Sequence, residues 1–173
     1  MKQIKWFNRK FDFSNEQNIF PSILERLKGT SILLEHKIST IPEAHFRINH
    51  KDEWSILENI GHLIDLEPIW LGRMQDIIIG DEIMRPVDLE NNKTNLANHN
   101  SREAKELVHE FAKIRRVLTN NLELLSEEEV FKSSLHPRLN KPMRIMDLFL
   151  FVAEHDDHHL ARISEITSSL QNG

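Results

Sequence analysis

Three histidines in this 173-residue chain have the side-chain type and spacing that suit a divalent metal. His155 and His159 stand four residues apart in the run Ala153-Glu154-His155-Asp156-Asp157-His158-His159. In a helix this spacing puts both imidazoles on one face, one turn apart, as in the H-x-x-x-H pair of zinc peptidases. His62 belongs to a different helical segment and is the candidate third ligand. Three imidazoles leave coordination positions open, so the pattern predicts a metal that does chemistry.

Three acidic residues near these histidines are candidates for supporting roles. Glu58 precedes His62 by one helical turn and is a candidate fourth ligand or general base, although a glutamate on a helix face is often simply solvated. Asp156 is a second candidate base, and Asp156 and Asp65 are candidates to orient the imidazoles by hydrogen bonds, although Asp65 could equally contact only water. The spacing alone also fits a solvated helix surface, or core histidines that bond to carboxylates.

A further candidate lies in the loop His136-Pro137-Arg138. Arg138 could contact an anionic group near the site, although a plain loop is the simpler interpretation. We interpret Trp54 and Trp70 as core residues. The other histidines lack a partner at metal-like spacing and are interpreted as surface or interface residues: His36, His45, His50, His99 and His109.

The segment that carries the histidine pair predicts a long helix from Pro142 to about Leu170. Its apolar residues recur at steps of three or four, and His155 and His159 fall in the same stripe. The stripe consists of Ile145, Leu148, Val152, His155, His159, Ile163, Ile166 and Leu170. Both imidazoles are therefore expected to face the interior of a helical bundle.

His62 lies in a second predicted helix, from about Glu53 to Ile79, with Asp52 as a plausible N-cap and Gly80 as a C-terminal stop. Apolar residues cover a wide arc of this helix. Such a helix is buried on several sides or lies at a dimer seam.

The remaining helices complete a bundle. Helical spacing predicts one from Pro21 to Ile38, and a capping box at Asn100-x-x-Glu103 opens another that ends near Leu125. A second box at Ser126-x-x-Glu129 predicts a short extra helix. Residues 81–98 form a polar connection that is long enough to be functional or to contain a short helix.

No strong strand is predicted, so the fold class is all-α: a four-helix bundle in one domain, residues 1–173. An N-terminal arm rich in aromatic residues is expected to pack over the bundle. It contains Trp6, Phe7, Phe11, Phe13 and Phe20.

Composition excludes several classes of function. The chain has no Cys and no Tyr, which excludes disulfides, thiolate ligands and cysteine or tyrosine catalysis. A formal net charge of −5 without a basic patch argues against nucleic acid as a partner. No apolar run approaches the roughly 18 residues of a membrane span. The N-terminus does not resemble a signal peptide, so the cytoplasm is the expected compartment.

Two segments together resemble the DinB/YfiT-like superfamily. They are Trp54-Ser55-x-x-Glu58-Asn59-Ile60-Gly61-His62-Leu63 and Ala153-Glu154-His155-Asp156-Asp157-His158-His159-Leu160. The resemblance extends to residues 11–14, 25–27, 92–94 and 136–139, and so covers nearly the whole chain. It implies a four-helix bundle that holds one divalent ion with three histidines, here His62, His155 and His159.

The resemblance implies several kinds of activity. Members include S-transferases and isomerases that use low-molecular-weight thiols, as well as metal-dependent hydrolases, and dimers are common. The leading hypothesis is a transferase that adds a thiol cosubstrate to an electrophilic small molecule at a Zn, Ni or Fe ion. The alternatives are a metal-dependent hydrolase and a non-catalytic metal-binding module that acts in a stress response or as a sensor.

Overall fold

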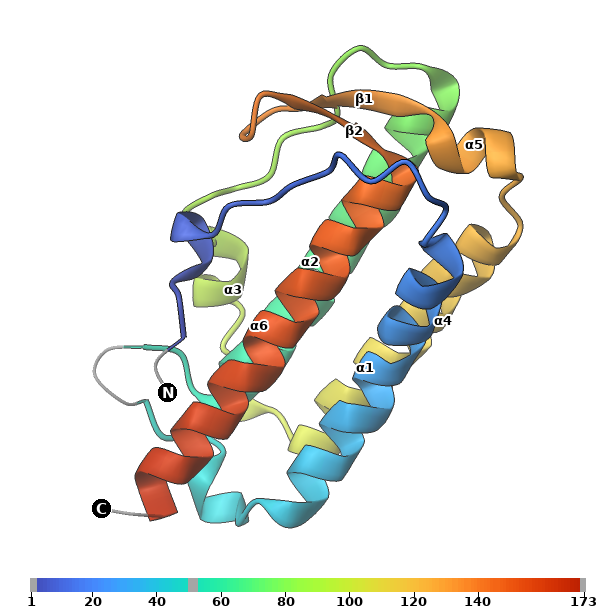
Figure 1. Cartoon of the computed structure of the whole chain (residues 1–173). Coiled ribbons are helices and arrows are strands. Elements are labelled where there is room, and N and C mark those ends of the chain that lie inside the picture. Colours follow the sequence, from blue (N-terminus) through green and yellow to red (C-terminus); the bar gives the residue numbers. More distant parts are fainter. Residues whose placement is uncertain (1–2, 50–52, 172–173) are drawn as a thin grey trace.

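The computed structural model describes residues 3–49 and 53–171, and four long helices dominate it (Figure 1). They are α1 (Phe20–Thr40), α2 (Ile56–Ile79), α4 (Ala104–Glu123) and α6 (Ile145–Gln171). Both α1 and α2 pack against α4 and against α6, so the order around the bundle is α1, α4, α2, α6. In Figure 1, α1 and α6 run in one direction and α2 and α4 in the other. The predicted four-helix bundle is confirmed.

Short elements precede or connect these helices. They are η1 (Trp6–Asn8), η2 (Glu43–His45), α3 (Asn92–Leu96), η3 (His99–Ser101), α5 (Glu127–Phe131), β1 (Ser133–His136) and β2 (Lys141–Arg144). The connection from α2 to α4 returns along the outside of the bundle and places α3 against α2 (Figure 1). The long polar connection therefore contains the short helix that its length suggested. None of the helices in the described ranges has the length and apolar character of a membrane span.

The start of α2 differs from the prediction. Ser55 is the N-cap: its hydroxyl accepts from the amide of Glu58, and the Glu58 carboxylate accepts from the amide of Ser55. This reciprocal capping box fixes the start of the helix at Ile56, three residues later than expected. The predicted cap, Asp52, lies outside the described residues. The predicted stop is confirmed, because Gly80 adopts the left-handed conformation with φ 86°.

A two-stranded antiparallel sheet contains the residues predicted to form the first turn of the last helix. Pro142 lies in β2, opposite Leu135 of β1, and α6 begins only at Ile145. Pro142 has no N–H, and the register with β1 makes it a strand residue rather than a helix opener. The carboxylate of Asp147 accepts from the amide of Arg144, which satisfies a donor at the helix start.

Of the two predicted capping boxes, only the second is confirmed. Ser126 and Glu129 cap each other's amides at the start of α5. The predicted box at Asn100 and Glu103 is wrong: Asn100 lies in η3 and its side chain accepts from the Ser55 hydroxyl at 2.7 Å. Asn100 therefore supports the start of α2 rather than the start of α4.

The core consists of two hydrophobic clusters, one toward each end of the bundle. On every long helix a buried polar residue falls between the two sets: Thr30 on α1, Glu67 on α2, Arg115 on α4 and Asp156 on α6. These four residues form a polar layer in the middle of the bundle.

The N-terminal arm packs on the bundle as predicted. The rings of Trp6 and Phe11 each lie 5.0 Å from the ring of Phe151 on α6. Phe20 differs, because it is the first residue of α1 rather than part of the arm.

Candidate metal centre

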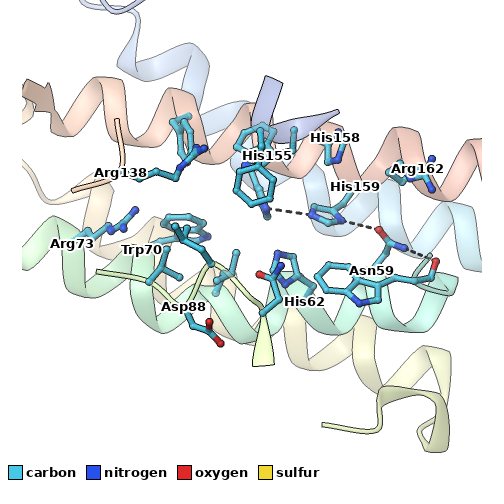
Figure 2. A pocket seen from close by; sticks show the side chains of 18 of the residues that line it. Asn59, His62, Trp70, Arg73, Asp88, Arg138, His155, His158, His159 and Arg162 are labelled. Carbon is cyan, nitrogen blue, oxygen red and sulfur yellow. Dashed lines mark hydrogen bonds between the residues drawn. The ribbon is translucent and has the colours of Figure 1, made fainter. Parts of the chain in front are cut away.

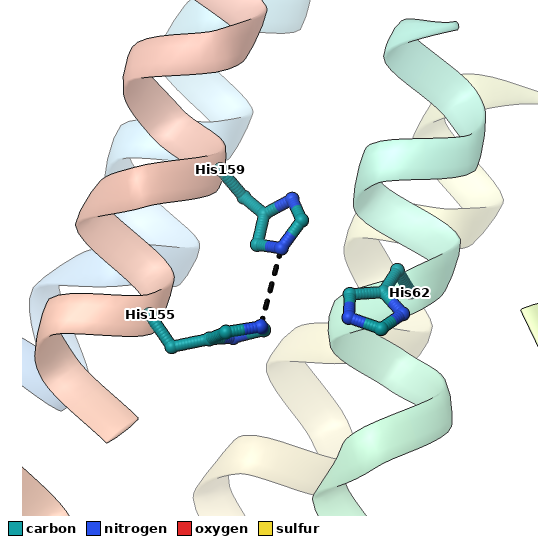
Figure 3. A group of neighbouring side chains, drawn as sticks. All are labelled: His62, His155 and His159. Atoms are coloured by element: carbon teal, nitrogen blue, oxygen red, sulfur yellow. Dashed lines mark hydrogen bonds between the residues drawn. The ribbon is translucent and has the colours of Figure 1, made fainter. Parts of the chain in front are cut away.

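The three predicted ligands lie together in the interior. His155 and His159 project from α6, and His62 faces them from α2 (Figure 3). All three side chains are buried, and one ligand nitrogen of each lies within 4.8 Å of the others. This is the one group of histidine and acidic side chains with metal-like spacing among the described residues.

A hydrogen-bond chain fixes the ring of His62. Its Nδ1 lies 3.0 Å from the Thr94 hydroxyl, which donates in turn to the Asp65 carboxylate at 2.9 Å. Because that hydroxyl uses its proton on the carboxylate, it accepts from His62, and Nδ1 carries the ring proton. The other nitrogen, Nε2, is left with a free lone pair, which is the arrangement that a metal ligand needs.

His159 is held in the same way by Asn59 on α2. The Asn59 amide nitrogen donates to the carbonyls of Trp54 and Ser55, so its oxygen is the acceptor that faces Nδ1 of His159, at 2.8 Å. Nδ1 of His159 therefore donates, and its Nε2 is free to bind an ion. Both histidines are thus oriented by residues that the spacing argument did not single out.

His155 completes the group, but fewer hydrogen bonds orient its ring than orient the other two. Its Nε2 lies 3.3 Å from Nε2 of His159. Its Nδ1 is buried and has no hydrogen-bond partner among the described residues. Trp6 of the N-terminal arm packs edge-on against the ring, with the centroids 4.9 Å apart. The aromatic arm therefore forms part of the site's wall.

The geometry fits a divalent ion. Two nitrogens that each lie about 2.0–2.1 Å from a tetrahedral ion are separated by about 3.3 Å, the separation seen between His155 and His159. Without an ion, one of these nitrogens must carry a proton to make the contact favourable. An ion between them would satisfy both lone pairs and leave Nδ1 of His155 protonated.

The electrostatics favour neutral ligands. Burial lowers the pKa of His62 to about 4, despite the nearby charge of Asp65. Burial and the neighbouring imidazoles also hold the pKa values of His155 and His159 well below the usual range. All three rings are therefore uncharged at neutral pH, the form that binds metal.

A cleft of about 340 Å³ opens beside the three imidazoles (Figure 2). Aromatic side chains from three regions form much of its wall: Trp6, Phe7, Trp54, Trp70 and Phe151. The interpretation of Trp54 and Trp70 as core residues is thus incomplete: Trp70 is buried and Trp54 half-buried, and both line the cleft. Such a cleft suits a small, largely apolar molecule next to the ion.

Two of the predicted supporting residues lie elsewhere. The Glu58 carboxylate is engaged in the capping box and accepts from Asn49 at 2.7 Å, so the structure does not bring it to the imidazoles. Asp156 follows His155 in sequence, but its carboxylate is fully buried in an ion pair with Arg115 and accepts from Thr30. Asp156 therefore neither orients an imidazole nor lines the cleft as a base, whereas Asp65 orients His62 through Thr94.

The structure also corrects the prediction for His99 and places Arg138 at the cleft. His99 is not a surface residue: it is buried, and its Nε2 lies 2.9 Å from the Asp65 carboxylate. Arg138 does line the cleft. Arg73 and His136 line it as well and were not predicted. His50 lies outside the described residues.

Comparison with known proteins supports this description. The family model of the DinB superfamily matches residues 27–163. No curated protein matches the chain.

Three solved structures share the fold. YfiT from Bacillus subtilis, described as a probable metal-dependent hydrolase with an unusual four-helix bundle topology, has 17% identity and a TM-score of 0.80, with 94% of each chain covered. A mycothiol-dependent maleylpyruvate isomerase has 13% identity and a TM-score of 0.66; the match covers 82% of this chain and 59% of the isomerase. A Streptococcus pneumoniae protein has 14% identity and a TM-score of 0.60, over 87% of this chain and 91% of its own. At these identities the likeness concerns the fold.

Proposed function

Because this chain belongs to the DinB superfamily, we propose that it is a metal-dependent transferase that adds a low-molecular-weight thiol to an electrophilic small molecule. His62, His155 and His159 would be the ligands of one divalent ion, for which Zn, Ni and Fe are all suitable with imidazole. The observation that carries the proposal is the convergence of three neutral imidazoles on one side of an open, aromatic cleft.

A divalent ion in this site would act as a Lewis acid that lowers the pKa of a bound thiol or water. The chain's own residues would hold the ligand nitrogens in place, through Thr94 and Asn59, and enclose the substrate. Trp54 and Trp70 provide flat apolar surfaces for it on the α2 side of the cleft. The sequence contains no Cys, so the thiol would come from solution.

The charged groups of the cleft favour thiol addition over hydrolysis. Hydrolysis of a substrate with a poor leaving group, such as an amide, is assisted by a proton donor. The Glu53 carboxylate is paired with Arg162, and the Asp88 carboxylate accepts from the amides of Glu90 and Asn92. Within the described cleft no acidic side chain is left free beside the imidazoles. Adding a thiol to an activated electrophile does not require such a proton donor.

The test is turnover with and without a thiol. The protein is purified without an affinity tag or chelator, its metal content is measured, and it is mixed with L-cysteine and a nitro-activated aryl chloride. We expect about one transition ion per chain and a metal-dependent rate of thioether formation. A parallel assay follows cleavage of para-nitrophenyl acetate without thiol.

The outcomes separate the three hypotheses. Ester cleavage without thiol, and no thioether formation, would support the hydrolase. A stoichiometric ion with neither activity, and no ligand exchange at the ion, would favour the non-catalytic module. Assembly as a homodimer stays a prediction, and sedimentation at assay concentrations checks it.

A further inference from the structure

The cleft has a second polar end, where two arginines stand without carboxylate partners. Figure 2 shows Arg73 on α2 and Arg138 on the opposite wall, at the end of the cleft away from His159. Arg138 belongs to the turn that joins β1 to β2. No carboxylate in the described part of the chain makes a salt bridge to either guanidinium. This pair therefore places positive charge at one end of an otherwise aromatic cleft.

Arg73 is almost fully buried, with 1% exposure, and only part of its guanidinium is used by the protein. Nε donates to the carbonyl of Arg85 at 3.1 Å, and Nη1 lies 3.0 Å from Nε2 of His136. Nη2 has no partner among the described residues. An unpaired buried donor is unfavourable, so a group that accepts from it is expected.

The nearby acidic residue does not neutralise Arg73. Asp76 is bound by Arg85, whose Nη2 lies 2.6 Å from its carboxylate. Burial lowers the pKa of Arg73 to about 10, and Asp76 and Arg138 act on it in opposite directions, so the group stays charged at neutral pH. Burial lowers the pKa of His136 to about 4, so this neighbouring ring is uncharged at neutral pH.

Arg138 is held by aromatic rings rather than by hydrogen bonds. Its guanidinium carbon lies 5.1 Å from the ring centroid of Phe7 and 5.9 Å from that of Phe151. Stacking on aromatic faces leaves the N–H edge of a guanidinium available to a ligand. Two such edges, one from each wall, suit the paired oxygens of a planar anion.

We propose that the cleft binds a substrate with a carboxylate at one end, held by Arg73 and Arg138, and an apolar body along Trp70 and Phe151. The inference rests on the proposed function in one respect: the reacting end of the substrate would lie at the three histidines. A carboxylate is favoured over a phosphate because the cleft is small and its walls between the two polar ends are aromatic.

Binding of phenylacetate, measured by calorimetry, tests the proposal. Phenylacetamide has the same shape without the charge, and inorganic phosphate tests the other anion. Measurements use the protein as purified and after chelator treatment, because a carboxylate can also bind a metal ion. We expect phenylacetate to bind in both forms, and phenylacetamide and phosphate to bind at least about tenfold more weakly.

Variants locate the binding. Arg138→Gln should weaken phenylacetate binding about tenfold or more while its metal content stays the same. Arg116→Gln removes an exposed arginine of α4 and should leave binding unchanged. Arg73→Lys should also weaken binding. Because it also removes hydrogen bonds of a buried residue, it can disturb the structure, and Arg138→Gln is therefore the decisive variant.

Failure of this inference and failure of the proposed function are distinguishable. His155→Ala should lose the metal and still bind phenylacetate. Equal binding of phenylacetate and phenylacetamide, tighter binding of phosphate, or unchanged binding in Arg138→Gln would overturn the carboxylate site, whatever the metal content.

Discussion

Thr94 and His62 are joined by a buried hydrogen bond, with 3.0 Å between the Thr94 hydroxyl and Nδ1 of His62. The two residues come from different elements: His62 from α2 and Thr94 from α3, in the connection that returns along the bundle. Asp65, one turn after His62, anchors the same hydroxyl at 2.9 Å. The long connection is therefore part of the metal site rather than a spacer.

Thr94→Val should weaken metal binding. Valine keeps the shape of threonine but leaves Nδ1 of His62 and the Asp65 carboxylate without the shared hydroxyl. Loss of such a supporting hydrogen bond typically costs about 10–100-fold in metal affinity. Competition with a chelating dye for Zn measures the effect. Thr94→Ser keeps the hydroxyl and is the control; equal affinities for valine and wild type would contradict the relay.

His159→Ala should abolish stoichiometric metal, whereas His158→Ala should leave it nearly intact. The neighbouring imidazoles have different surroundings: Nε2 of His159 faces His155, and Nδ1 of His158 lies 3.3 Å from Arg9. Elemental analysis of both variants, purified in the same way, measures the difference. Equal losses of metal would show that the ligand assignment is wrong.

Gly61→Ala should destabilise the protein and disturb the support of His62. A Cβ at Gly61 would lie 2.2 Å from the ring of His99, which must then move away from Asp65. Overpacking of this kind typically costs about 1–3 kcal/mol. The control is Gly29→Ala on α1, where a Cβ would meet nothing within 4 Å. It should stabilise the helix by about 0.5–1 kcal/mol. Urea denaturation of both variants measures these changes, and equal effects would contradict the close packing at Gly61.

The metal-free protein should lose stability between pH 6.5 and pH 4. Burial lowers the folded-state pKa of both His62 and His136 from 6.5 to about 4. The unfolded chain therefore binds more protons than the folded protein in this range, and stability falls as the pH falls. Urea midpoints measured in the presence of a chelator report the trend. A midpoint that stays constant from pH 7 to pH 4.5 would mean that these rings are not buried as neutral groups.

The sequence predicted those features that repeat with the helical period. His155 and His159 share an apolar stripe, so their inward direction followed from spacing alone, and the bundle followed from similar stripes elsewhere. The supporting residues have no such signal. Thr94 and His99 reach the site through the path of a long connection, and a polar residue in a connection does not reveal which helix it will contact.

Local patterns also failed where tertiary contacts override them. Asn100 and Glu103 have the spacing of a capping box, but Asn100 bonds to Ser55 instead. Pro142 is typical of a first helical turn, but pairing with β1 makes it part of a strand. Arg73 lies on the same side of α2 as His62, but its contacts with the carbonyl of Arg85 and with His136 of β1 depend on segments distant in sequence and could not be predicted from spacing.

The polar layer in the middle of the bundle provides the last prediction. Arg115 is 2% exposed and donates to Glu67 at 3.0 Å, to Asp156, and to the carbonyl of Leu27 at 3.3 Å. Asp156 also accepts from Thr30 at 2.9 Å. The layer thus links all four long helices, and it lies one residue along α6 from His155.

Arg115→Met should destabilise the protein severely, because it leaves the buried carboxylates of Glu67 and Asp156 without a counter-charge. Removing one partner of a buried ion pair typically costs about 3–5 kcal/mol. Glu67→Gln should be much milder, since an amide oxygen can still accept from Arg115 and burial already raises the pKa of Glu67. Urea denaturation of the two variants at pH 7 measures the contrast. A loss below about 1 kcal/mol for Arg115→Met would mean that the polar layer adds little to stability.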